Sequence, residues 1–289
     1  MKTATSSSRG LSSRIRILAV SLGIAMAGLY SQADAAAVDS ELVLLVDITQ
    51  RGLNNHEFED VMQGYASAMT SSQVLDSIGS GATGKIAVSL VFYGNSLTHV
   101  VGIPWMMISN ATEAQQFADM ARNLSRPVSN TSPSIETAID FAMGHFGSET
   151  GGSGNGFESD VQIVEVVAAS LPTLPNPDAV QDSRDGALAT GVDVINAVAI
   201  GNSTRDIKNF FEDNVVGGAI AGNQGSATAS KANNSLANFL ASDLAKSIED
   251  GGTAPSSVPE PSSAVLGSVA ILLLLRRRRP LAVPRSHRP

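Results

Sequence analysis

The chain has 289 residues, a net charge of −8 and no cysteine. Between residues 36 and 258 the charge is more negative, −16, because nine lysines and arginines stand against 25 acidic residues. This acidity argues against nucleic acid or an anionic membrane surface as a partner, since both bind positively charged proteins. The central ~215 residues suffice for one hydrophobic core without disulfides.

The first 35 residues have the pattern of a secretory signal peptide. Four basic residues and no acidic residue precede the apolar run 17–29, and a small-x-small step ends at Ala35. This order predicts export and cleavage by signal peptidase after Ala35 or nearby Ala37. The apolar run is shorter than the ~20 residues of a membrane span, which argues against a permanent N-terminal anchor.

Residues 38–250 alternate between two hydrophobic periods. The apolar runs 42–46, 86–93, 161–169 and 192–200 predict buried strands, the first of which ends in Asp47. A short turn separates 86–93 from residues 98–103, so that segment is predicted to pair antiparallel. Helices are predicted at 55–70, 112–124 with Thr112 as N-cap, 134–146, 177–190, 204–213 and 236–248, with loops at 148–157 and 217–230.

Strands that alternate with helices predict one α/β domain. We expect a Rossmann-like, doubly wound and mostly parallel sheet with one antiparallel edge strand. Because Asp47 ends a parallel strand, it is expected at the carboxyl edge of the sheet, where doubly wound folds bind ligands. The run 79–84 matches G-x-G-x-x-G by letter but precedes a strand, so it is interpreted as a turn that ends a helix.

The C-terminal region has the pattern of a second sorting signal. Pro259, Glu260 and Pro261 precede the apolar run 264–275 and four arginines at 276–279. This order resembles the PEP-CTERM sorting tail of exosortase substrates. The resemblance implies an inner-membrane intermediate, anchored transiently through the C-terminal helix with its arginines in the cytoplasm, and then cleavage by exosortase and display at the cell surface or in the extracellular matrix. A plain C-terminal anchor is the alternative.

These patterns divide the chain. We expect a signal peptide at 1–35, a folded domain at 38–250, a linker at 251–258, a sorting tail at 259–279 and a disordered tail at 280–289.

The domain also resembles a known family. The stretches ELVLLVDITQRG, PWMMI and NFFEDNVVGG occur in the order typical of a secreted bacterial branch of the von Willebrand factor type A domains, a branch of unknown function. The resemblance implies a Rossmann-like sandwich with a divalent-metal adhesion site at the top of the sheet. Such sites hold Mg²⁺ with oxygen ligands and bind partners rather than catalyse reactions.

The metal ligands implied by that resemblance are mostly missing. Asp47 matches the first Asp, and Thr49 keeps a hydroxyl at the first Ser position, but Arg51 replaces the second Ser and has no acceptor atom. Pro133 stands at the expected Thr, with Thr131 two residues away, and Ala169 at the expected acid. We therefore expect Asp47 and Thr49 to be the remnant of a vacant metal site, with no cofactor. Asp47 is then left to accept hydrogen bonds from backbone amides or to form a salt bridge with Arg51 in the metal's place.

Other polar residues give weaker signals. His56, His99 and His145 are scattered and predict surface or loop positions rather than a zinc site. Glu165 lies in an apolar run, where burial would raise its pKa unless a donor pairs with it, and Arg122 or Arg184 is the expected partner. No catalytic residues are predicted.

Three functions remain open from the sequence. The leading hypothesis is an exported, surface- or matrix-displayed, non-catalytic binding or structural protein with a degenerate metal-adhesion site, whose partner is an extracellular protein or exopolysaccharide. The alternative is a Mg²⁺-dependent adhesin of the type A class that engages an acidic partner. The third is an uncharacterised hydrolase.

Overall fold

The structure is a computed structural model that describes residues 35–51, 53–127, 132–173, 175–201, 204–233 and 235–252. The chain divides into a unit of residues 1–36 and a unit of residues 37–289, and the fold below belongs to the second. The predicted signal peptide, except Ala35, and the predicted sorting and disordered tails lie outside the described residues. Within the described part of the chain, no helix has the length and apolarity to cross a membrane.

A central sheet organises the domain, in the strand order β4-β3-β2-β6-β7-β8-β9. β2 (Ser40–Asp47) pairs in parallel with β3 (Ile86–Tyr93) and with β6 (Gln162–Ala168), which in turn pairs in parallel with β7 (Val194–Ile200). At one edge, β4 (His99–Ile108) runs antiparallel to β3. The predicted fold class, mostly parallel with an antiparallel edge strand, is therefore confirmed.

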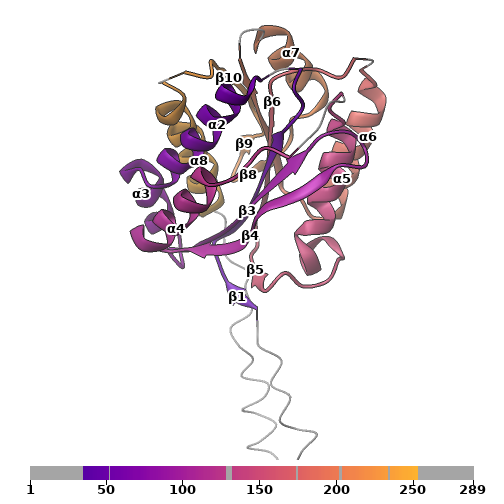
Figure 1. The fold of residues 1–289 in the computed structure, drawn as a ribbon. Helices are drawn as coiled ribbons and strands as arrows, with labels where there is room; N and C mark the ends of the chain where they lie inside the picture. The colour runs from indigo at the N-terminus through magenta and orange to yellow at the C-terminus, as the bar shows by residue number, and fades with distance from the viewer. Residues whose placement is uncertain are drawn as a thin grey trace, which may run out of the picture. The chain divides into compact units, whose positions relative to one another are not determined.

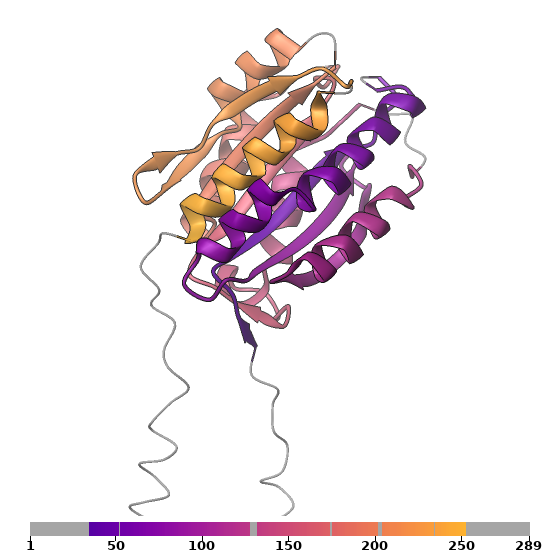
Figure 2. The ribbon, with the colours of Figure 1, turned by 90° about the vertical axis from the view of Figure 1, so that its left-hand side faces the viewer.

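Helices cover both faces of this sheet (Figures 1 and 2). One face carries α2 (Asn55–Met69), α3 (Ser72–Ser80), α4 (Ala111–Arg122) and α8 (Leu236–Gly252). The other carries α5 (Ile135–His145), α6 (Pro177–Thr190) and α7 (Thr204–Asn214). Because side chains alternate along a strand, Leu42 and Leu44 of β2 pack under the first group and Val43 and Leu45 under the second.

Helix starts follow local capping chemistry. α2 has a capping box: the Asn54 side chain accepts from the Glu57 amide at 3.0 Å, and Glu57 accepts from the Asn54 amide at 2.8 Å. For α4 the prediction of Thr112 as N-cap is wrong. The cap is Asn110, whose side-chain oxygen accepts from the amides of Thr112 at 2.9 Å and Glu113 at 3.1 Å. An Asn satisfies these orphan amides as well as a Thr does, and it lies one residue before the helix.

The predicted loop 217–230 is wrong, because this segment extends the sheet. It forms β8 (Gly217–Ile220), β9 (Asn223–Gln224) and β10 (Ala227–Ser230). β8 pairs antiparallel and β10 in parallel with β7. Close backbone approach explains the small residues: a Cβ at Gly218 would lie 2.1 Å from the Asp193 carbonyl oxygen. Such strands lack the apolar alternation by which strands are recognised in a sequence.

The remaining elements are short. They are β1 (Ala36–Ala37), the 3₁₀ turn η1 (Gly147–Thr150) and β5 (Phe157–Glu158). The run 79–84 ends α3, whose C-cap is Gly81, and leads towards β3, as the predicted helix-ending turn requires. Residues 251 and 252, predicted as the start of the linker, are the last residues of α8.

Candidate functional site

Asp47 ends β2 at the carboxyl edge of the sheet, where the strand pattern predicts it. Its side chain is buried, and Oδ1 accepts a hydrogen bond from the Thr49 amide at 2.7 Å. Oδ2 is also buried and has no hydrogen-bond partner among the described residues. Burial raises the pKa of Asp47 to about 6, and the Thr49 hydrogen bonds and the charge of Arg126 oppose that rise. The expectation that Asp47 accepts backbone amides therefore agrees with the geometry.

The other residues expected around the metal site lie in different surroundings. Thr49 is buried, and its Oγ1 lies 3.4 Å from the hydroxyl of Ser170, which follows β6. Arg51 is exposed, and no ion pair within the described residues joins it to Asp47, so the predicted salt bridge is wrong. Thr131 lies outside the described residues. In the described part of the chain, no group of three or more His, Asp or Glu side chains is placed to hold a metal ion.

Arg126 is the cation that contacts the loop after β2. Its Nε donates to the Ile48 carbonyl at 2.9 Å, Nη1 donates to the Leu53 carbonyl at 2.9 Å, and Nη2 donates to the Thr49 carbonyl. The guanidinium carbon also lies 5.4 Å from the ring centroid of Phe58, within the range of a cation–π interaction. One side chain from the segment after α4 thus holds the loop that carries Thr49. We call this set of contacts the Arg126 clamp.

The sequence did not indicate the Arg126 clamp. Arg126 lies 78 residues from Ile48 and 73 from Leu53 along the chain. Its partners are backbone carbonyls, which every residue has, so no side-chain pattern marks the contact. The available signal was that Arg126, one of nine lysines and arginines between residues 36 and 258, comes shortly after a predicted helix. That signal is too general to place the side chain.

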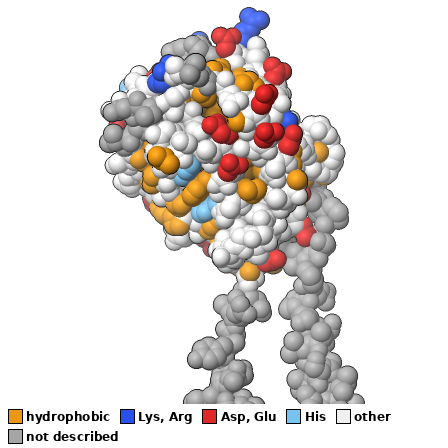
Figure 3. All heavy atoms as spheres, turned by 90° about the vertical axis from the view of Figure 1, so that its right-hand side faces the viewer, with side chains coloured by type: hydrophobic (Ala, Val, Ile, Leu, Met, Phe, Trp, Pro, Cys, Tyr) orange, Lys and Arg blue, Asp and Glu red, His pale blue; other side chains and the backbone are white. Residues whose placement is uncertain are grey.

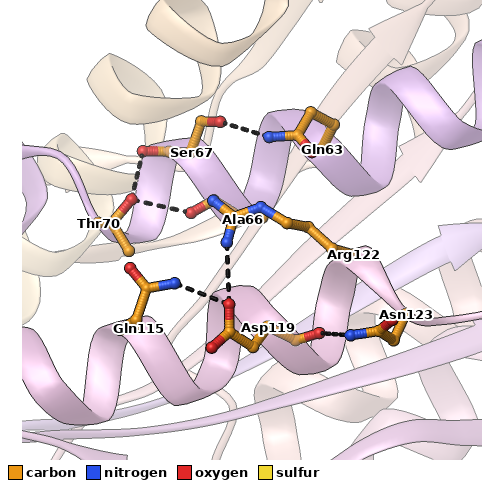
Figure 4. Close-up of polar contacts among 8 residues, drawn as sticks. All are labelled: Gln63, Ala66, Ser67, Thr70, Gln115, Asp119, Arg122 and Asn123. Atoms are coloured by element: carbon orange, nitrogen blue, oxygen red, sulfur yellow. Dashed lines mark hydrogen bonds and ion pairs between the residues drawn. The ribbon is translucent and has the colours of Figure 1, made fainter.

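An open pocket lies beside the Arg126 clamp, between α2 and the segment after α4. Its volume is about 560 Å³, and a second pocket of about 290 Å³ shares three of its residues, Glu59, Arg122 and Leu124. Polar side chains continue along the facing helices (Figure 4): on α4, Asp119 accepts from Gln115 at 2.7 Å and from Arg122 at 3.1 Å. On α2, Gln63 donates to Ser67 at 3.1 Å. Of these side chains, Arg122 and Gln63 line the pockets, and the others continue the polar surface along the two helices.

Glu165 has a different partner from the one predicted. The Tyr65 hydroxyl donates to its Oε1 at 2.6 Å, and both side chains are fully buried. Arg122 pairs instead with Asp119, and Arg184 with Asp185, because both arginines lie at the surface and do not extend into the core. Burial raises the pKa of Glu165 to about 8, and the nearby charge of Asp243 acts in the same direction. This carboxyl is part of the core between α2 and β6.

Two of the histidines lie on the β4–α5 side of the domain, where each ring stacks on an aromatic side chain. The His99 ring stacks on Phe141 with centroids 5.1 Å apart, and the His145 ring stacks on Trp105 at 5.2 Å. The prediction of scattered surface positions is wrong for these two, because β4 and α5 pack together. It is right for His56, whose side chain is 83% exposed. Figure 3 shows histidine side chains among hydrophobic ones on this face.

His145 also contacts a serine, in an arrangement that is structural. The Ser89 hydroxyl donates to the Ile103 carbonyl at 2.8 Å and lies 2.9 Å from Nε2 of His145. Since the hydroxyl proton is engaged, the histidine donates to Ser89 through Nε2–H. Ser89 is fully buried in β3, so a substrate cannot reach it. The pair joins β3 to α5 and does not form a nucleophile with its base.

The sheet order, the helices on both faces and the aspartate at the carboxyl edge define a von Willebrand factor A-like α/β domain. Residues 37–245 match the family model described as "Protein of unknown function (DUF1194)". The chain belongs to this family. No curated protein is significantly similar to it.

Solved structures share the fold at low sequence identity. The von Willebrand factor domain of the type V pili tip protein Mfa5 from Porphyromonas gingivalis is 10% identical, with a TM-score of 0.50 over 76% of this chain and 98% of that one. Proximal thread matrix protein 1 from the mussel byssus is 14% identical, with a TM-score of 0.50 over 75% of this chain. A von Willebrand factor type A protein from Catenulispora acidiphila is 10% identical, with a TM-score of 0.47 over 74% of this chain. The chain spans 49% of the mussel protein and 43% of the Catenulispora protein.

Proposed function

We propose that this protein is an exported, non-catalytic binding or structural protein whose carboxyl-edge site works without a metal ion. A von Willebrand factor A-like domain suggests a binding or structural role. The proposal adds that the metal-adhesion site has degenerated and that Asp47 and Thr49 are its remnant. The pocket beside the Arg126 clamp is the candidate contact surface for an extracellular protein or an exopolysaccharide.

The Arg126 clamp is the observation that carries this proposal. A divalent cation at this edge would need several oxygen ligands, and Mg²⁺ would need them near octahedral geometry. Asp47 and Thr49 offer side-chain oxygens, whereas Arg51, Pro133 and Ala169 offer none. The three carbonyls contacted by Arg126 already have a positively charged partner. A guanidinium therefore supplies the charge and the loop contacts that a metal ion would otherwise supply.

Export rests on the sequence patterns at the two ends. The signal peptide and the Pro259-Glu260-Pro261 tail support passage through the inner membrane, with signal peptidase and exosortase as processing partners. The acidic surface supports solubility outside the cell and gives no basic surface for nucleic acid. Display at the cell surface or in the extracellular matrix is the destination that this order of segments supports.

Titration with Mg²⁺ tests the proposed metal independence. The chelator-treated full-length chain should give no heat of Mg²⁺ binding in isothermal titration calorimetry that depends on Asp47. The Asp47→Asn variant is the control, because it removes the ionised oxygen and keeps the shape of the side chain. Micromolar Mg²⁺ binding that is lost in Asp47→Asn would overturn the proposal in favour of the Mg²⁺-dependent adhesin.

A further inference from the structure

The exposed large hydrophobic side chains of the domain lie along the edge strand β4 and the helix next to it. Among the described residues they are Leu97, exposed at 90%, Val100 at 41%, Val101 at 40% and Met120 at 38%. The first three belong to the β3–β4 turn and to β4, and Met120 belongs to α4, which packs against β4. Val101 pairs with Val91, whose side chain lies on the sheet face that α5 covers, so Val101 points to that face. Scattered apolar residues need no explanation, but a cluster of them marks an interaction site.

Charged side chains are absent from this part of the sequence. No Lys, Arg, Asp or Glu occurs from residue 86 to residue 112, a stretch that contains β3, the turn and β4. For β3, which pairs with a strand on each side and is buried, packing alone explains this. β4 is the last strand of the sheet on its side and has exposed positions, where edge strands commonly carry lysine or other charges. Burial therefore does not explain why β4 is uncharged.

A row of half-buried aromatic rings continues this surface from β4 onto α5. The His99 ring stacks on Phe141, with centroids 5.1 Å apart, and Phe141 stacks on His145 at 5.7 Å. His145 in turn stacks on Trp105 at 5.2 Å, and Trp105 Nε1 donates to the His145 carbonyl at 3.0 Å. Burial lowers the pKa of both histidines, so their rings are uncharged at neutral pH. Aromatic side chains are enriched at the centres of protein–protein interfaces.

The backbone of β4 is shaped against pairing with another strand. Its register with β3 shifts between Val88 and Leu90 and again between Leu90 and Val91, which indicates bulges in β4. Pro104 also removes one backbone donor from the middle of the strand. Bulges and prolines prevent edge-to-edge association of sheets. A contact at this edge is therefore expected to use side chains rather than an added strand.

The charge of the domain indicates what kind of partner fits this surface. Helix α5, which carries Phe141 of the aromatic row, contains Glu136 and Asp140 and no Lys or Arg. Asp140 is exposed and directly precedes Phe141. Figure 3 shows acidic side chains beside the hydrophobic and histidine side chains of this face. Residues 36–258 carry a charge of −16, so two copies of the domain repel each other, whereas a basic partner is attracted.

We propose that the β3–β4 turn, β4 and α5 form a docking surface for a basic protein. Apolar side chains of the partner cover Leu97, Val101 and the aromatic row, and its lysines or arginines contact the acidic rim at Asp140. We call this the β4 surface. It is separate from the pocket beside the Arg126 clamp, which lies between α2 and the segment after α4. The domain then has two binding surfaces, and the β4 surface does not depend on the proposed loss of the metal site.

Two synthetic peptides test the β4 surface on the full-length chain. They share the apolar centre Trp-Val-Leu-Val, and one is flanked on both sides by lysines and the other by glutamates. In fluorescence anisotropy at about 20 mM NaCl, the lysine peptide should bind with a dissociation constant of about 1 mM or tighter. The glutamate peptide should bind at least about tenfold more weakly, and about 0.5 M NaCl should weaken binding of the lysine peptide several-fold.

Substitutions locate the binding site of the lysine peptide. The double variant Leu97→Asn/Val101→Thr should keep the wild-type Tm, because both side chains are exposed, and should weaken binding by about tenfold or more. Asp140→Lys should weaken binding by about threefold or more. Glu249→Lys makes the same change in net charge on the exposed side of α8 and is the matched control, with affinity within about twofold of the wild type.

Four results would overturn the proposal. They are no binding of the lysine peptide, equal binding of the two peptides, binding that is unchanged in the double variant, and an equal effect of Asp140→Lys and Glu249→Lys. Sedimentation equilibrium of the full-length chain tests the other occupant: self-association that is lost in the double variant would assign the β4 surface to a second copy of this chain. Asp47→Asn should leave binding of the lysine peptide unchanged, which separates this test from that of metal independence.

Discussion

At the scale of single residues, Arg126 holds the loop at the carboxyl edge of the sheet through hydrogen bonds. In a domain with few basic side chains, this one donates to the carbonyls of Ile48, Thr49 and Leu53 and packs on Phe58. Arg122, four residues earlier, pairs with the neighbouring Asp119 and lies at the surface. The two arginines line the same pocket. They therefore provide a matched pair for measuring what the clamp contributes.

We expect Arg126→Ala to lower the free energy of unfolding by about 2–4 kcal/mol. It removes three hydrogen bonds from a charged donor and leaves part-buried carbonyls without a partner. Arg126→Lys should recover only part of the loss, because an ammonium group cannot reach three carbonyls in the geometry of a guanidinium. Urea denaturation in the presence of chelator measures both effects.

Arg122→Ala is the control for that experiment. Its exposed ion pair is worth about 0–1 kcal/mol, so the variant should unfold close to the wild type. If Arg126→Ala were as stable as Arg122→Ala, the clamp would not hold the loop. Addition of Mg²⁺ should not restore the stability of Arg126→Ala.

At the scale of elements, the N-cap of α4 lies two residues before the position that the sequence pattern predicts. The apolar positions of α4 place the helix correctly, but its N-cap is Asn110 and not Thr112. The reason is that both residues are cap formers, and the spacing of apolar residues defines a helix end only to within one or two positions. Mutation of the two residues distinguishes the cap from its neighbour.

We expect Asn110→Ala to cost about 1 kcal/mol of unfolding free energy, because the amides of Thr112 and Glu113 lose their acceptor. Thr112→Ala should change stability by less than about 0.5 kcal/mol, since its side chain is exposed in the first turn of α4. Thermal or urea unfolding followed by circular dichroism gives both values. A larger loss of stability in Thr112→Ala than in Asn110→Ala would show that Thr112 is the N-cap.

The small-residue segment 217–230 is a case in which the sequence pattern does not predict the secondary structure. Its strands form where the backbone approaches β7 closely, at Gly218 and Gly225, and Ile220 is the single large apolar side chain of the segment, which is too few to give a period. A Cβ at Gly225 would lie 2.6 Å from the Ile195 carbonyl oxygen. Close backbone packing and a surface loop use the same residues, so the sequence cannot separate them.

At the scale of the whole molecule, the buried acid Glu165 makes global stability depend on pH. Its pKa is raised from 4.5 to about 8 in the folded state, so between these values the folded protein keeps a proton that the unfolded chain releases. The unfolded state binds fewer protons, and the free energy of unfolding therefore falls as pH rises from about 5 to 8. One such group contributes a slope of up to about 1.4 kcal/mol per pH unit.

Urea denaturation between about pH 5 and pH 8, in the presence of chelator, checks this pH dependence. Glu165→Gln should reduce the slope by the contribution of one proton, whatever its effect on stability at a single pH. Glu249→Gln, on the exposed side of α8, is the matched control and should keep the wild-type slope. Stability that rises with pH over this range would show that Glu165 is ionised in the folded protein.

The sequence by itself determined the fold class and the place of its key acid. Four apolar runs defined the parallel strands, and a short turn defined the antiparallel edge strand, because burial on both faces leaves a local hydrophobic signal. The position of Asp47 at the carboxyl edge followed from the end of its strand. The metal remnant at Asp47 and Thr49 and the sorting signal at residues 259–261 stay predictions from the sequence.

Only the tertiary structure decided which side chains meet. Arg126 rather than Arg51 reaches the loop after β2, and Tyr65 rather than an arginine pairs with Glu165. In each case the partners are far apart in the chain or are backbone atoms, so no spacing records them. Buried positions can be recognised in a sequence because apolar residues repeat with the local period of a helix or strand. Long-range polar contacts leave no such pattern, because they depend on how the helices pack across the sheet.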